Sequence, residues 1–169
     1  MKASRVTFRL LGGAGATCAL LGLIVPVASI RPAHPPISGT EHPPDAFRHP
    51  SFLSEITNDF EWSEWGVERV ELVIAAVLVA AALVGLNWAV DRPATRALVG
   101  AGGVAIWAAA SHVSASFNLS DRAGTGVWIT RGHAEDLLLV GGAALVVAPI
   151  AALMIGALGR LLRSAESGD

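Results

Sequence analysis

The sequence predicts an all-α integral membrane protein, a four-transmembrane-helix bundle with its N-terminus and C-terminus both cytoplasmic. The first observation is a set of four apolar stretches that contain no Lys, Arg, Asp or Glu: Leu10–Ile30, Leu72–Val90, Ala97–Phe117 and Leu137–Gly159. At a rise of about 1.5 Å per residue, a helix of about 20 residues crosses a hydrocarbon core of roughly 30 Å. The second observation is composition, because 53% of the 169 residues are hydrophobic and 15% are charged, against about 25% charged in globular domains.

The third observation is the distribution of charge around the four stretches. Seven of the 12 Lys and Arg residues flank the ends that we assign to the cytoplasm: Lys2, Arg5, Arg9, Arg92, Arg96, Arg160 and Arg163. The other face, residues 31–71 and 118–136, carries five arginines and eleven acidic residues. Basic flanks remain in the cytoplasm, so the two longer loops are expected outside. Arginine outnumbers lysine eleven to one, which is typical of a GC-rich prokaryote, and we expect a multi-pass protein of the plasma membrane.

We interpret the chain as a single membrane domain, residues 1–169, with spans at about 10–30, 70–90, 97–117 and 137–159. The first apolar stretch has a second interpretation as a cleaved secretory signal, because it follows three basic residues and precedes a tolerable cleavage site at Val27-Ala28-Ser29. Its 21 residues exceed the usual 7–15 of a signal core, which favours a retained helix. The lone Cys18 predicts neither an internal disulfide nor a thiolate metal site.

The first outer segment, 31–69, begins with a proline-rich stretch, residues 31–50, which holds six of the nine prolines in the chain. Proline favours extended, non-helical backbone. His34, His42 and His49 repeat within this stretch and are weak candidate ligands for a divalent metal. The next residues, 51–65, predict a short helix along the membrane surface, with Phe52, Ile56 and Phe60 on one face and Trp62 and Trp65 at the interface.

Small residues recur four apart in the later spans, which predicts close contact between helices. The repeats are Ala76/Ala80, Ala101/Ala105/Ala109 and Ala144/Ala148/Ala152/Gly156. Pro26 and Pro149 each remove a helix hydrogen bond, so we expect a kink or an end at each position.

The third span contains the candidate polar site, which is formed by Ser111, His112, Ser114 and Ser116. His112 is the only ionisable side chain within an apolar stretch. Polar groups at this depth face a neighbouring helix or a water-filled recess. The role of His112 has three alternatives: a structural histidine, part of a proton or ligand path, or a haem or metal site shared with His133.

The second outer loop, 118–136, contains Asn118-Leu119-Ser120, a weak N-glycosylation pattern at the end of a span. Residues 124–130 predict a turn followed by a short extended stretch, with Trp128 at the interface.

These residues do not form the usual catalytic sets of a hydrolase or an ion-driven pump, so we expect a protein that is not an enzyme and that has no cofactor. The first functional hypothesis is a structural or accessory subunit of a membrane complex. The second is a small oligomeric transporter or channel with a polar path near His112, and a weaker alternative is a haem-binding redox subunit. The expected partners are the membrane lipid bilayer and a membrane protein or further copies of this chain, and not a nucleic acid.

Overall fold

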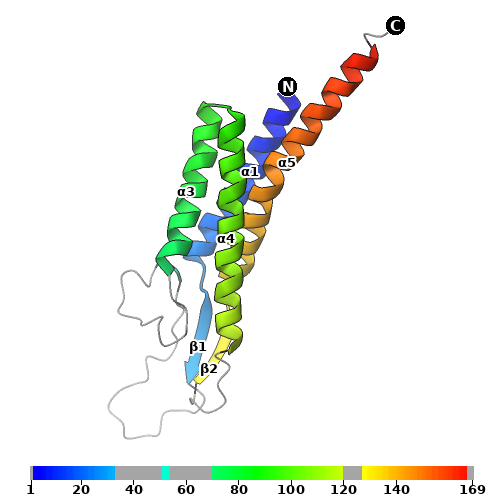
Figure 1. Ribbon diagram of the computed structural model, residues 1–169. Helices are drawn as coiled ribbons and strands as arrows, with labels where there is room; N and C mark the ends of the chain where they lie inside the picture. Colours follow the sequence, from blue (N-terminus) through cyan, green and yellow to red (C-terminus); the bar gives the residue numbers. More distant parts are fainter. Residues whose placement is uncertain (1, 33–50, 54–69, 120–126, 167–169) are drawn as a thin grey trace, which may run out of the picture.

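The computed structural model describes residues 2–32, 51–53, 70–119 and 127–166. Within these ranges the elements are α1 (Lys2–Ile24), β1 (Ala28–Pro32), α3 (Val70–Ala89), α4 (Pro93–Leu119), β2 (Val127–Arg131) and α5 (Ala134–Glu166). The helices alternate in direction along the bundle, so the beginning of α1 and the end of α5 lie at the same end (Figure 1). We call this the termini end, and the opposite end, which holds the two strands, the ribbon end.

Three of these helices, α1, α3 and α5, are long and apolar enough to cross a membrane. The chain is therefore a helical membrane protein. The helix α4 is 27 residues long but is not among the three, so its crossing of the membrane stays a prediction.

The helices differ from the predicted spans mainly at their ends. α1 begins at Lys2 and ends at Ile24, earlier at both ends than the predicted 10–30. Pro26 explains the early end, because a proline lacks the amide donor and disfavours helical backbone in the residue before it. α5 continues without interruption through Pro149. The predicted surface helix and the proline-rich stretch lie mostly outside the described residues. Phe52, one of the few residues described in this segment, is buried in a turn near the ribbon end.

The bundle packs around α5, which contacts both α1 and α4, while α3 packs against α4 and α1. Two successive glycines of α5 face these two neighbours. A Cβ placed on Gly141 would lie 2.7 Å from the backbone N of Ala19 in α1. One placed on Gly103 of α4 would lie 2.7 Å from the carbonyl O of Gly142. Backbone therefore meets backbone in both interfaces, as in tightly packed membrane helices.

The predicted repeat of small residues is confirmed in two helices and only in part in the third, where Ala109 is half-buried against the core. Ala80 of α3 and Ala148 and Ala152 of α5 are fully buried. In α4, however, Ala101 and Ala105 are exposed. The buried face of α4 instead carries a set of residues on the other side of the helix: Val99, Gly103, Ile106 and Ala110.

A two-stranded ribbon joins the chain after α1 to the chain before α5 (Figure 1). β1 and β2 pair antiparallel, with Ile30 opposite Ile129. The pairing extends toward the helices, because the amide of Gly132 donates to the carbonyl of Val27 at 2.7 Å. The extended stretch predicted near residues 124–130 is thus present as β2, whereas Ala28–Ile30, predicted at the end of the first span, form a strand.

Candidate functional site

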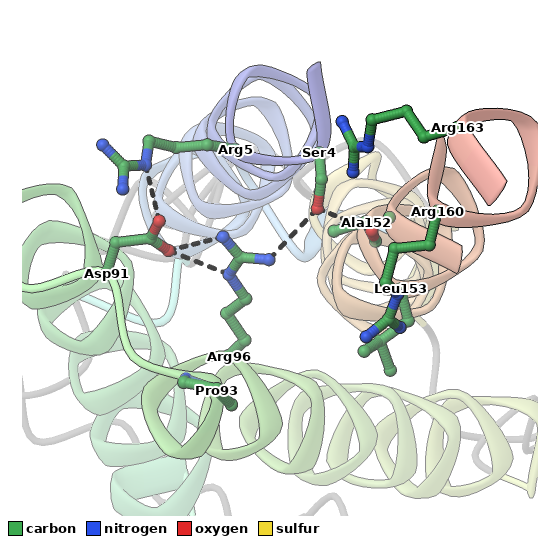
Figure 2. Close-up of a pocket in the computed structure, with 10 residues that line it drawn as sticks. Ser4, Arg5, Asp91, Pro93, Arg96, Ala152, Leu153, Arg160 and Arg163 are labelled. Atoms are coloured by element: carbon green, nitrogen blue, oxygen red, sulfur yellow. Dashed lines mark hydrogen bonds and ion pairs between the residues drawn. The ribbon is translucent and has the colours of Figure 1, made fainter. Parts of the chain in front are cut away.

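The polar side chains with the most complete set of contacts lie at the termini end of the bundle. Asp91, in the short connection between α3 and α4, accepts hydrogen bonds from two arginines. Arg5 of α1 donates its Nε–H to Oδ2 at 2.5 Å. Arg96 of α4 donates Nε–H and Nη2–H to Oδ1, at 3.0 and 2.5 Å. We call Ser4, Arg5, Asp91 and Arg96 the polar cluster (Figure 2).

Local sequence explains why these groups meet. Proline is favoured in the first turn of a helix, and Pro93 begins α4 immediately after the turn that holds Asp91. Arg96 then lies one helical turn into α4, where its side chain reaches back to Asp91 five residues earlier. The α3–α4 connection is short, so it holds the carboxylate beside the first turns of α1.

The polar cluster continues from Arg96 to α5. Arg96 donates Nη1–H to Ser4 Oγ at 3.3 Å, and Ser4 donates its hydroxyl to the carbonyl O of Ala152 at 2.6 Å. The Arg96 guanidinium also lies 5.4 Å from the ring centroid of Phe8, a cation–π distance. The Arg96 guanidinium and the Ser4 hydroxyl thereby connect α1, the α3–α4 connection, α4 and α5.

The electrostatics of the cluster favour an ionised Asp91. Its side chain is 15% exposed and that of Arg96 is 17% exposed. Burial raises the pKa of Asp91, but the hydrogen bonds and charges of Arg96 and Arg5 outweigh it, and the net pKa lies below its ordinary value of 3.8.

A second set of contacts lies beside the cluster, at the end of α3. Arg9 donates Nη2–H to the carbonyl of Trp88 at 2.8 Å, and its guanidinium lies 5.7 Å from the Trp88 ring centroid. Thr95 donates its hydroxyl to Oδ1 of the fully buried Asn87 at 2.6 Å. Among the described residues, Nδ2 of Asn87 and Nε of Arg9 have no hydrogen-bond partner.

A cavity of about 410 Å³ opens beside the polar cluster, between α1, the α3–α4 connection, the start of α4 and α5. It is lined by Ser4, Arg5, Asp91, Pro93, Arg96, Ala152, Leu153, Gly156, Arg160 and Arg163. Figure 2 shows Arg160 and Arg163 entering from α5, on the side of the cavity away from Asp91. We call it the arginine cavity. It can accept an anion, because four arginines and one aspartate line it.

The predicted polar site of the third span lies elsewhere. His112 is exposed on α4, and the half-buried Ser111 donates its hydroxyl to the carbonyl of Trp107 at 2.9 Å within the same helix. Such bonds to the preceding turn are common for serine in helices. Ser114, Ser116 and Asn118 belong to α4 by their backbone, and their side chains lie outside the described part.

The metal predictions are not tested by the structure. His34, His42 and His49 lie outside the described residues. Nδ1 of His133, the residue before α5, lies 3.6 Å from Oδ2 of Asp136 in the first turn of that helix, and both side chains are exposed. In the parts of the chain that the structure describes, no three His, Cys, Asp or Glu side chains are grouped as metal ligands.

The polar cluster was missed by sequence reasoning, which used its arginines only to orient the protein. One signal was present: Asp91 is the sole acidic residue in the short stretch 91–96 between two apolar segments, which also holds Arg92 and Arg96. An acid among basic residues at a helix boundary indicates an ion pair, but the partners on α1 are more than 80 positions away.

Comparison with known proteins adds no assignment, since the chain matches no family model and no curated protein.

Proposed function

We propose that the protein is a non-enzymatic structural or accessory subunit of a membrane complex. In this proposal all four helices cross the plasma membrane of a prokaryote and the termini end lies in the cytoplasm. The observation that carries the proposal is the filled interior of the bundle. Gly15 and Gly103 approach the backbone of α5 closely, and Ile106, Leu138 and Leu145 are fully buried between the helices. A bundle packed in this way is a rigid body whose outer faces are available for contact.

The outer face of α4 supports a contact with a transmembrane helix of a partner subunit. Ala97, Ala101, Ala105 and Ala108 are all exposed there. Small side chains allow two helix backbones to approach closely in lipid, and this chain's own bundle uses the opposite face of α4. We call these four alanines the outer alanine face.

The test is a matched pair of leucine variants in native membranes. Ala105→Leu blocks the outer alanine face, and the control Ala82→Leu adds the same side chain to an exposed position of α3. After extraction in mild detergent, we expect the wild type and the control to migrate on a native gel well above the 17.4 kDa chain, and Ala105→Leu to lose that mass. Migration of the wild type as a monomer, or an equal response of the two variants, contradicts the proposal.

A second candidate is a small oligomeric transporter or channel. The exposed position of His112 on α4 favours a polar path between copies over one through a single bundle. In vesicles, replacing His112 with Leu abolishes flux if the histidine lines such a path, whereas an accessory subunit shows no flux in either form. The weaker haem alternative predicts visible absorbance of the purified protein, which a spectrum tests directly.

A further inference from the structure

The arginine cavity has more positive charge than its own acid balances. Both carboxylate oxygens of Asp91 already accept hydrogen bonds from Arg5 and Arg96. Arg160 and Arg163, on the α5 wall, have no ion-pair partner among the described residues. Within the described part of the chain, the cavity therefore presents two guanidinium groups that no carboxylate pairs.

The preferred ligand of such a wall is a phosphate group. Arginine offers several N–H donors in a planar fork that matches phosphate oxygens, and these charge-assisted bonds are stronger than neutral ones. The guanidinium of Arg96 is held in place by Asp91, Ser4 and the Phe8 ring. Part of the site is therefore ordered before a ligand binds, which reduces the entropy cost of binding.

The apolar surroundings distinguish a lipid from a soluble anion. Leu153 lines the cavity and is 65% exposed, and its neighbour Met154 is 68% exposed. Leu153 lies seven residues before Arg160, which is about 10 Å along the helix axis. A phospholipid spans such a boundary, with its phosphate at the arginines and its acyl chains along the apolar surface of α5.

We infer that the arginine cavity binds the phosphate of an anionic phospholipid at the membrane surface. Basic recesses between transmembrane helices are suited to such headgroups. The inference does not depend on the proposed accessory role, because a lipid site of this kind fits a subunit and a transporter equally.

The test uses the purified full-length protein in detergent and measures lipid binding by native mass spectrometry. The added probes are phosphatidylglycerol, phosphatidylcholine and inorganic phosphate. The variant is Arg160→Gln with Arg163→Gln, which removes two exposed charges and leaves the polar cluster intact. The matched control, Lys2→Gln with Arg92→Gln, removes the same charge from exposed positions that do not line the cavity.

We expect the wild type and the control to bind phosphatidylglycerol in preference to phosphatidylcholine. The cavity variant should show an apparent Kd raised about tenfold or more, the loss expected for charge-assisted bonds. Equal binding of the two lipids, or equal loss in the control, overturns the site. Binding of inorganic phosphate that displaces phosphatidylglycerol overturns the lipid assignment and leaves a soluble phosphate as the ligand. Thermal unfolding of the variant in the absence of lipid verifies that it remains folded.

Discussion

At the scale of single residues, one carboxylate organises the termini end of the bundle. Asp91 joins α1 to the beginning of α4 through Arg5 and Arg96, and Arg96 extends the connection to Ser4 and the carbonyl of Ala152 in α5. Exposed ion pairs contribute little to stability. The Asp91–Arg96 pair differs because both side chains are largely buried and the guanidinium donates two hydrogen bonds to the same oxygen.

The first prediction is that Asp91→Asn destabilises the protein by about 1–3 kcal/mol, the cost of leaving a buried polar partner unsatisfied. The control is Asp136→Asn, which alters an exposed pair with His133 and should cost less than about 1 kcal/mol. Reversible unfolding in mixed micelles measures both. Equal stability of Asp91→Asn and the wild type contradicts the central role of the carboxylate.

The second prediction concerns pH. The pKa of Asp91 is lower in the folded protein than its ordinary value of 3.8, so its ionised form stabilises the fold. That contribution is complete above the unfolded pKa, near pH 4, and is lost as the pH falls through the folded pKa. Unfolding curves between pH 7 and pH 2.5 should show this loss in the wild type. Asp91→Asn lacks the group and should lose less stability over the same interval; parallel curves contradict the prediction.

At the scale of elements, hydropathy located the helices but not their ends or their faces. The predicted 70–90 nearly coincides with Val70–Ala89, whereas α4 and α5 extend beyond 97–117 and 137–159 into polar turns. Hydropathy detects the part of a helix in lipid, and a helix continues until its backbone hydrogen bonds end. In the α4 repeat only Ala109 packs against the core, whereas Ala101 and Ala105 are exposed, because two positions along a helix turn the side chain by about 200° away from the buried Val99 and Gly103. Spacing alone does not indicate which of two small-residue faces meets a neighbour.

The third prediction tests the contact between α4 and α5. Gly103→Ala places a Cβ 2.7 Å from the carbonyl O of Gly142 and 2.8 Å from the Leu145 Cβ. Both neighbours are parts of the fully packed interface, so the helices must separate, at a cost of about 1–3 kcal/mol. Gly85→Ala is the matched control, because a Cβ there meets nothing within 4 Å. Unfolding of the two variants should differ by this amount, and an unaffected Gly103→Ala would show that the helices are not in close contact.

At the scale of the whole molecule, α1 and α5 are joined at both ends. The ribbon β1–β2 connects them at the ribbon end. At the termini end, Ser4 of α1 donates a hydrogen bond to the carbonyl of Ala152 in α5. The sequence predicted an even number of crossings from hydropathy and charge. It did not predict the ribbon, because strand pairing across about 100 residues leaves no local pattern in two segments of five residues. The polar cluster was hidden for the same reason, since its side chains come from two regions more than 80 residues apart and its contact on α5 is a backbone carbonyl.

The fourth prediction is the orientation of the bundle in the membrane. With α1, α3, α4 and α5 all crossing, an epitope tag at the N-terminus and one at the C-terminus are reachable from the same side, the cytoplasm, because basic flanks remain there. In a Cys18→Ala background, Leu53→Cys supplies a probe at the ribbon end, where Leu53 is 41% exposed. An impermeant maleimide added to intact cells should label Leu53→Cys, while both tags require permeabilised cells for detection. Tags on opposite sides would show that α4 or another helix does not cross. Tags detected on intact cells, with Leu53→Cys protected from the maleimide, would place the arginine cavity outside the cell.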